Sequence, residues 1–193
     1  MKVNTSRFGE LAVNGNDIIT FEEGLLGFEN LRKFFVVDPG DSTLILWLQS
    51  IEDSHIAFPI IEPKIFKPDY VAILMPSDMK PLELNSIAEA KVYTILTIPS
   101  DISQMSANLK APIIINKATS KAKQIVLQDN KLTVRHAMYL DLKRYISRFN
   151  SDDSKRTNVA ITEAMNADNA SDLKSSDASS AKSKSKVKES NPQ

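Results

Sequence analysis

Two histidines and three pairs of adjacent acidic residues are the side chains whose chemistry could serve catalysis or metal binding. His55 and His136 stand 81 residues apart, and neither belongs to a cluster with the spacing of metal ligands. The acidic pairs are Glu22-Glu23, Glu52-Asp53 and Asp152-Asp153. Adjacent residues on a strand point to opposite faces, and a turn leaves both in water. We therefore expect solvated acidic pairs, no metal site and no acid/base catalyst.

Motifs that bind phosphate or activate a nucleophile are missing from the sequence. The segment Gly24-Leu25-Leu26-Gly27 has the glycines of a tight turn, but no Lys-Ser/Thr follows it. Neither a G-x-G-x-x-G nor a G-x-S-x-G pattern occurs anywhere. There is no cysteine, which excludes disulfides, thiolate zinc sites and a cysteine nucleophile. We expect a protein that is not an enzyme and that needs no cofactor.

The elements that must position any functional residue are strands for the most part. Short runs rich in Ile, Val and aromatic residues alternate with turn residues, which predicts a mostly β protein with a single antiparallel barrel-like domain and one or two short helices. The predicted strands are 11–13, 18–21, 34–37, 44–48, 56–61, 70–74, 92–98, 112–115 and 124–127.

Turn and proline positions refine this prediction. Asn14-Gly15 favours a type I′ turn, so residues 11–21 are predicted to form a hairpin. The segment Pro39-Gly40-Asp41-Ser42 predicts a turn between the next two strands. Pro59 and Pro112 cannot donate to a ladder, so each is expected at an edge strand, a bulge or the start of a strand.

Two segments have helical features. Residues 77–86 could begin with Ser77 as N-cap, and Pro81 limits that helix to about one turn. Residues 138–149 place Met138, Leu142 and Tyr145 on one face. That apolar face is expected to dock onto the barrel. The alternatives are a docking helix for a partner and, given the basic opposite face, an element on a membrane surface.

Composition divides the chain into a folded domain at 1–149 and a tail at 150–193. No aromatic residue follows Phe149, and the polar tail cannot bury enough apolar surface to offset its ordering entropy, so disorder is expected. Residues 1–135 carry 14 Lys and Arg against 16 Asp and Glu, which argues against a core that binds nucleic acid. The basic run at 182–188 is expected to be solvated.

The sequence has no signal peptide at its N-terminus and no apolar run near the roughly 20 residues that span a bilayer. We therefore expect a cytoplasmic protein with no membrane contact.

Several segments, in order over about residues 1–136, resemble the FliW flagellar assembly factor family. The similarity is strongest at Met105-Ser106-Ala107-Asn108-Leu109-Lys110-Ala111-Pro112-Ile113-Ile114-Ile115-Asn116, followed by Gln124. Ala122 stands where the family pattern has glycine, which would loosen a turn, and the segment after His136 has no counterpart. The other matching segments are Thr5 to Glu10, Asp17 to Phe21, Glu23 to Glu29, Trp47 to Ser50, Ala57-Phe58 and Pro68-Asp69-Tyr70.

The resemblance implies a small cytoplasmic β-barrel-like factor with two protein partners. FliW proteins bind flagellin and also CsrA, an RNA-binding translational repressor. When flagellin accumulates it occupies FliW and leaves CsrA free to repress flagellin synthesis; after flagellin is exported, FliW antagonises CsrA. The chain would then act as a monomer, without direct contact to nucleic acid.

Six residues are candidates for partner contacts: Asn108, Gln49, Asp69, Tyr70, Phe58 and Trp47. Trp47 and Phe58 are either interface aromatics or core residues, since both lie within apolar runs. Asn108 begins an apolar strand, so its amide either caps a turn or faces a partner.

Rival functions remain open on the residues alone. One is a nucleic-acid-binding β-barrel whose basic tail grips RNA, and another is a flagellin chaperone without the CsrA arm. A small hydrolase with an acidic pair in a cleft and a structural piece of the flagellum are further alternatives.

Overall fold

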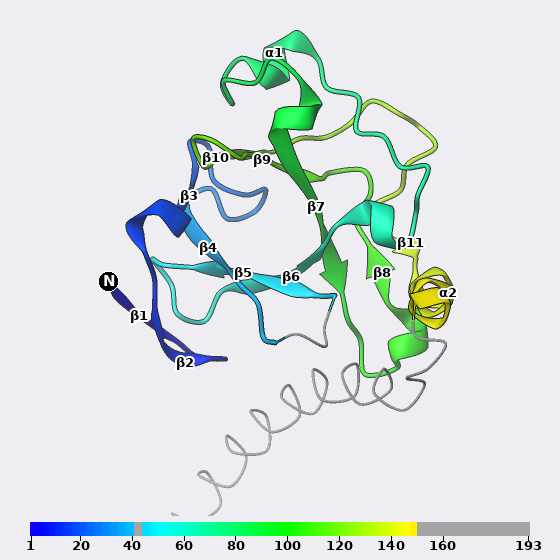
Figure 1. Ribbon diagram of the computed structural model, residues 1–193, viewed down its shortest axis with the longest axis horizontal. Helices are drawn as coiled ribbons and strands as arrows, with labels where there is room; N and C mark the ends of the chain where they lie inside the picture. The colour runs from blue at the N-terminus through cyan, green and yellow to red at the C-terminus, as the bar shows by residue number, and fades with distance from the viewer. Residues whose placement is uncertain (41–43, 150–193) are drawn as a thin grey trace, which may run out of the picture. The chain divides into compact units, whose positions relative to one another are not determined.

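Seven strands close into a barrel in the computed structural model, which describes residues 1–40 and 44–149 (Figure 1). Around the barrel the order is β7-β6-β5-β4-β3-β10-β9, and β9 pairs again with β7. Every pair is antiparallel except β10 with β3, which run parallel with Lys121 opposite Thr20. The strands are β3 (Ile19–Phe21), β4 (Lys33–Val37), β5 (Leu46–Ser50), β6 (Ala57–Ile61), β7 (Ala90–Thr97), β9 (Ile113–Asn116) and β10 (Lys121–Gln124).

The other elements lie outside this ring. A hairpin forms from β1 (Lys2–Thr5) and β2 (Gly9–Ala12), while β8 (Ser106–Ala107) and β11 (His136–Ala137) extend the sheet beyond β7. The α-helices within residues 1–40 and 44–149 are α1 (Pro76–Met79) and α2 (Tyr139–Phe149). No helix among the described residues is long and apolar enough to cross a bilayer. Short 3-10 helices occupy Gly15–Asp17, Pro63–Ile65, Ile87–Glu89 and Ile102–Gln104.

The alternation of side chains along each strand separates the inside of the barrel from its outside. Phe34 points inward while its neighbour Phe35 packs on the outer face, and Leu48 and Trp47 divide in the same way. All seven strands contribute to the interior cluster, which includes Phe21, Ile60 and Ile113 with almost no exposed surface.

Two further apolar clusters cover the outer surface of the barrel. On one side, Ile61, Leu96 and Ile114 pack against the segments 65–84 and 125–142. On another, the β1–β2 hairpin covers Phe35 and Trp47. The guanidinium of Arg7 lies 3.8 Å from the centre of the Trp47 ring, a cation–π contact.

The prediction of a mostly β, barrel-like domain with short helices is confirmed, but the hairpin predicted at Asn14-Gly15 is wrong. Residues Gly15–Asp17 form a 3-10 turn in which Asp17 N donates to Asn14 O. β2 pairs with β1 rather than with β3, because Thr5 Oγ1 accepts from Phe8 N and donates to Gly9 O and so closes a turn there.

Three other expectations about the strands also need correction. The sheet is not wholly antiparallel, because the β10–β3 pair that closes the barrel is parallel. Residues 70–74 belong to no strand, because Tyr70 and Ala72 anchor them to the outer cluster instead. The last predicted strand lies earlier in the chain, at Lys121–Gln124, so Ala122 sits inside the barrel and not in a turn.

The helical predictions hold in part. The helix α1 is a single turn, as Pro81 predicts, but it starts at Pro76 with Asp78 accepting a hydrogen bond from Met75 N, so Ser77 is not the N-cap. The predicted helix at 138–149 is confirmed as α2. Its face docks on the outer cluster through Leu142, as the first alternative expected. The tail at 150–193 lies outside the described residues.

Pro59 marks the place where two barrel strands separate. Ile56 O accepts from Ser50 N, so even-numbered residues of β6 turn their backbone groups to β5 and odd-numbered ones turn theirs to β7. Pro59 therefore lacks the N–H that would face β7. The pairing of β6 with β7 is confined to Ile60 and Ile61. The preceding β6 residues, Ala57 to Pro59, do not pair with β7.

Docking of α2 is expected to contribute strongly to stability. Leu142 is 2% exposed against the outer cluster, whereas Leu140 on the same helix is 64% exposed. Leu142→Ala should lower the free energy of unfolding by about 2–5 kcal/mol, as for other buried leucines. Leu140→Ala is the matched control and should change it by less than about 0.5 kcal/mol. Urea denaturation of both variants measures this, and equal effects would contradict the docking.

Tyr70 is expected to make stability fall at alkaline pH. Its hydroxyl donates to Leu109 O at 3.0 Å, and burial raises the pKa of Tyr70 to about 12 from the ordinary tyrosine value of 10.0. The folded state favours the neutral phenol, so this stabilisation is complete below pH 10 and is lost as the pH rises towards 12.

Tyr70→Phe should therefore cost about 1 kcal/mol at pH 7 through the lost hydrogen bond, yet lose less stability than the wild type between about pH 10 and pH 12. Urea denaturation of Tyr70→Phe and the wild type, at pH 7 and between about pH 10 and pH 12, measures the difference in stability. Tyr139→Phe is the control, since the Tyr139 hydroxyl forms no hydrogen bond within residues 1–40 and 44–149. Parallel pH profiles for Tyr70→Phe and the wild type would refute the assignment.

Candidate functional site at the barrel mouth

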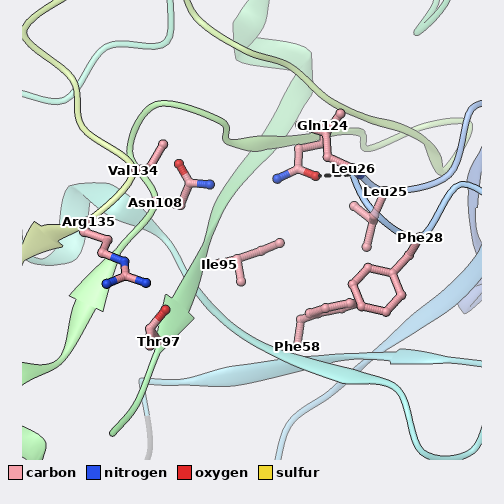
Figure 2. Close-up of a pocket in the computed structure, with 10 residues that line it drawn as sticks. All are labelled: Leu25, Leu26, Phe28, Phe58, Ile95, Thr97, Asn108, Gln124, Val134 and Arg135. Carbon is pink, nitrogen blue, oxygen red and sulfur yellow. Dashed lines mark hydrogen bonds between the residues drawn. The ribbon is translucent and has the colours of Figure 1, made fainter.

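A pocket of about 270 Å³ opens at one end of the barrel, where β6 and β7 diverge (Figure 2). Phe58 on β6 and Thr97 at the end of β7, both outside the paired stretch of these strands, line the pocket. Its floor is Ile95, whose side chain belongs to the barrel interior. We call this pocket the barrel mouth; its ten lining residues are Leu25, Leu26, Phe28, Phe58, Ile95, Thr97, Asn108, Gln124, Val134 and Arg135.

The loop between β3 and β4 presents apolar side chains to solvent at the mouth. Gly24 and Gly27 have φ values of +74° and +84°, and Phe28 N donates to Leu25 O, so the loop turns tightly. Leu25 is buried by this turn, while Leu26 is 56% and Phe28 37% exposed. The Phe28 ring meets Phe58 edge to face at a centroid distance of 5.0 Å.

Gln124 at the end of β10 holds two sides of the mouth together. Its Oε1 accepts from Leu26 N at 3.1 Å, the dashed line in Figure 2, and its Nε2 donates to Ala111 O at 3.2 Å. The same side chain thus fixes the β3–β4 loop and the loop before β9. Both hydrogen bonds are to backbone groups, so Gln124 fixes the positions of the two loops and of the apolar side chains that they carry.

Asn108 forms the opposite side of the mouth. Its Oδ1 accepts from Ala111 N at 3.0 Å, and its backbone N donates to Ile95 O at 2.9 Å. Thr94 Oγ1 donates to the carbonyl of Asn108, and the Tyr70 hydroxyl holds the next carbonyl, that of Leu109. The side-chain amide is directed into the pocket (Figure 2).

Two of the three acidic pairs, Glu22-Glu23 and Glu52-Asp53, lie among the described residues and serve the scaffold, whereas Asp152-Asp153 lies outside them. Glu23 pairs with Lys123 at 3.0 Å, which links the start of the β3–β4 loop to β10. One carboxylate oxygen of Glu52 accepts from the backbone N–H groups of Arg32 and Lys33, which fixes the entry to β4. In the part of the chain that the structure describes, no three metal-ligating side chains gather in one place.

The structure brings two of the six candidate contact residues, Asn108 and Phe58, together at the mouth. Trp47 is buried under the β1–β2 hairpin, and Gln49 is fully buried, with Nε2 donating to Ile56 O at 3.0 Å. Tyr70 is buried, and its hydroxyl donates to the carbonyl of Leu109 in the 108–112 loop. Asp69 is exposed elsewhere and pairs with Lys67, which lowers the pKa of its carboxyl.

Sequence reasoning missed the other eight residues that line the mouth, among them Leu26, Phe28, Gln124 and Arg135. The glycines at 24 and 27 did predict a tight turn, and a turn that carries a leucine and a phenylalanine is the signal that could have indicated exposed apolar side chains. Arg135 carried no such signal, because it stands in a polar stretch before β11.

Gly24 is expected to be essential for the shape of the mouth. A Cβ there would lie 2.6 Å from the Cα of Glu29, and the φ of +74° disfavours any other residue. Gly24→Ala should lower the free energy of unfolding by about 1–3 kcal/mol or more. Gly15→Ala is the control, since a Cβ at Gly15 meets nothing within 4 Å. Equal urea midpoints for the two variants would contradict this account.

Comparison with known proteins places this barrel in a family. A sequence profile described as FliW protein matches residues 2–138. The chain is 44% identical over 146 residues to the flagellar assembly factor FliW of Bdellovibrio bacteriovorus, covering 76% of this chain and 83% of the relative. It is 45% identical over 139 residues to that of Thermosipho africanus, covering 72% and 95%.

The fold agrees with that assignment. A crystal structure of the flagellar assembly factor FliW superposes with a TM-score of 0.67 at 28% identity, covering 72% of this chain and 96% of the other. The sequence match spans every strand of the barrel and every residue that lines its mouth. The chain therefore belongs to the FliW family of flagellar assembly factors.

Proposed function

We propose that this flagellar assembly factor binds flagellin and CsrA in alternation in the cytoplasm, as a monomer, and so couples flagellin synthesis to export. The observation that carries the proposal is the barrel mouth, where Leu26, Phe28 and Val134 are 56%, 37% and 60% exposed around one apolar opening. Apolar side chains gathered at one opening are typical of a surface that binds another protein.

The size and lining of the mouth favour a protein partner over a small ligand. Its volume of about 270 Å³ is slightly below the roughly 300–1,000 Å³ of small-molecule pockets. An aromatic pair, Phe28 and Phe58, stands at its edge, and such aromatics dominate the energetics of interfaces. The apolar face of an amphipathic helix, which flagellin's helical ends offer, suits an opening of this kind.

Alternation requires that the binding of one partner oppose the binding of the other. A single mouth makes the binding of flagellin and the binding of CsrA mutually exclusive if both partners cover it. The charge of residues 1–135, with 14 basic against 16 acidic side chains, is compatible with a basic partner such as an RNA-binding repressor.

The first experiment is calorimetric titration of the full-length chain with CsrA, repeated after saturation with flagellin. We expect binding of CsrA that disappears when flagellin is present. Binding of flagellin without any binding of CsrA would leave a flagellin chaperone as the function. Simultaneous binding of both at full affinity would refute alternation.

Phe28 is expected to be a major contact. Phe28→Ala should weaken flagellin binding by about tenfold or more, since truncating an interface aromatic costs about 1–4 kcal/mol. Ile73→Ala is the matched control, because Ile73 is 73% exposed outside the mouth and should leave the dissociation constant unchanged. Calorimetry gives both constants, and urea midpoints confirm that both variants fold. Wild-type affinity in Phe28→Ala would exclude the mouth as the flagellin site.

A further inference from the structure

Ile95 on β7, Asn108 directly after β8 and Arg135 directly before β11 form one row across the barrel mouth. β7 and β8 pair with Leu96 opposite Ala107, which sets Ile95 beside Asn108. β11 and β8 pair with His136 opposite Ala107, so one residue further Arg135 lies beside Asn108. Directly opposed side chains on neighbouring strands have Cβ atoms about 4.5–5.5 Å apart. All three residues line the pocket.

The two polar members of this row are donors without acceptors in the part of the chain that the structure describes. Ala111 N donates to Asn108 Oδ1, which fixes the orientation of the amide and leaves Nδ2 facing the pocket. Within residues 1–40 and 44–149, Nδ2 has no hydrogen-bond partner and the Arg135 guanidinium has no ion pair. Arg135 is the only charged residue among the ten that line the mouth.

The opposite wall of the mouth is apolar. Leu25, Leu26, Phe28 and Phe58 stand across Ile95 from Asn108 and Arg135 in Figure 2. A partner that covers Phe28 would also displace water from the two donors. A purely apolar occupant would then leave an amide and a guanidinium without acceptors, which is unfavourable. A carboxylate that reaches both donors removes this penalty and forms charge-assisted hydrogen bonds.

We propose that the barrel mouth recognises an amphipathic helix that carries an acidic side chain one turn from a large apolar residue. The apolar residue packs on Leu26, Phe28 and Phe58, and the carboxylate accepts hydrogen bonds from Asn108 Nδ2 and Arg135. The inference rests on the proposed function in taking the mouth as the partner site, and it adds the chemistry that the partner must present there.

The structure favours this occupant over others. Residues four apart on a helix lie on the same face, about 5–6 Å apart, so one helix face supplies both groups. The exposed N–H groups that capture a free C-terminal carboxylate are lacking at this row, where Asn108 N already donates to Ile95 O. A nucleic-acid backbone would call for several cations, and the lining offers one.

Matched peptides test the proposal directly. The probes are acetylated, amidated, alanine-rich helices that carry leucine and, four residues later, either glutamate or glutamine. A third probe carries glutamine and a free C-terminal carboxylate. Titration of the full-length chain, followed by the side-chain amide resonances of Asn108, should show the glutamate peptide binding about tenfold or more tightly than the other two. Equal binding of the glutamate and glutamine peptides, or tighter binding of the third, would overturn the proposal.

Two variants locate the donors. Asn108→Asp keeps the acceptor for Ala111 N and replaces the donor Nδ2 with an oxygen, so the turn is retained while recognition of the carboxylate is lost. Arg135→Glu reverses the charge at the mouth, and Lys131→Glu makes the same change of net charge outside its lining. The first two should weaken binding of the glutamate peptide by about tenfold or more, and Lys131→Glu by less than about twofold. Equal effects at 131 and 135 would indicate long-range attraction and refute the site.

The same variants titrated with flagellin separate this inference from the proposed function. If Phe28→Ala weakens flagellin binding while Asn108→Asp and Arg135→Glu do not, the mouth binds flagellin and the carboxylate contact is refuted. If the peptides bind as expected and flagellin does not bind at all, the chemistry of the mouth stands and flagellin is not its partner.

Discussion

The missing N–H of Pro59 is the constraint on which the rest of the site depends. A barrel strand normally bonds to a neighbour on each side, and Pro59 stands where β6 should donate to β7. With no donor at that position, β6 pairs with β7 only from Ile60 onward, and the interior of the barrel becomes accessible beside Phe58. Phe58, one residue earlier on β6, is an interior residue exposed at its edge for that reason. A proline that weakens a sheet thereby opens the barrel mouth, which we propose as the binding surface.

The loops around this opening are held by backbone contacts, which makes the mouth a preorganised surface. Gln124 bonds to the main chain of two loops, and Asn108 bonds to the turn that follows it. The tight turn at Gly24 fixes Phe28 against Phe58. A partner therefore spends little free energy on ordering this side of the interface. The arrangement also divides the mouth into an apolar wall and a wall of donors.

Local patterns predicted most of the barrel, because alternation of apolar and polar residues reports directly which face of a strand is buried. These patterns failed where contacts with residues distant in the sequence determine which structure a segment adopts. Residues 70–74 have the composition of a strand, yet Tyr70 anchors them to the outer core instead. Asn14-Gly15 has the residues of a hairpin turn, but Thr5 closes a different hairpin first.

The mouth itself was predicted only in part for the same reason. Residue type indicated Asn108 and Phe58 as contact residues. Residue type also indicated Trp47, which the β1–β2 hairpin covers. Nothing in the local sequence indicates Arg135, because its place depends on the register of β11 with β8.

The contacts that close the barrel join residues far apart in the sequence. The parallel pairing of β3 with β10 joins Thr20 to Lys121, and the bond from Leu26 to Gln124 spans 98 residues. Loop closure over such a separation slows folding. A ribosome must therefore release the chain as far as Gln124 before the barrel can close, so the barrel mouth forms late in synthesis.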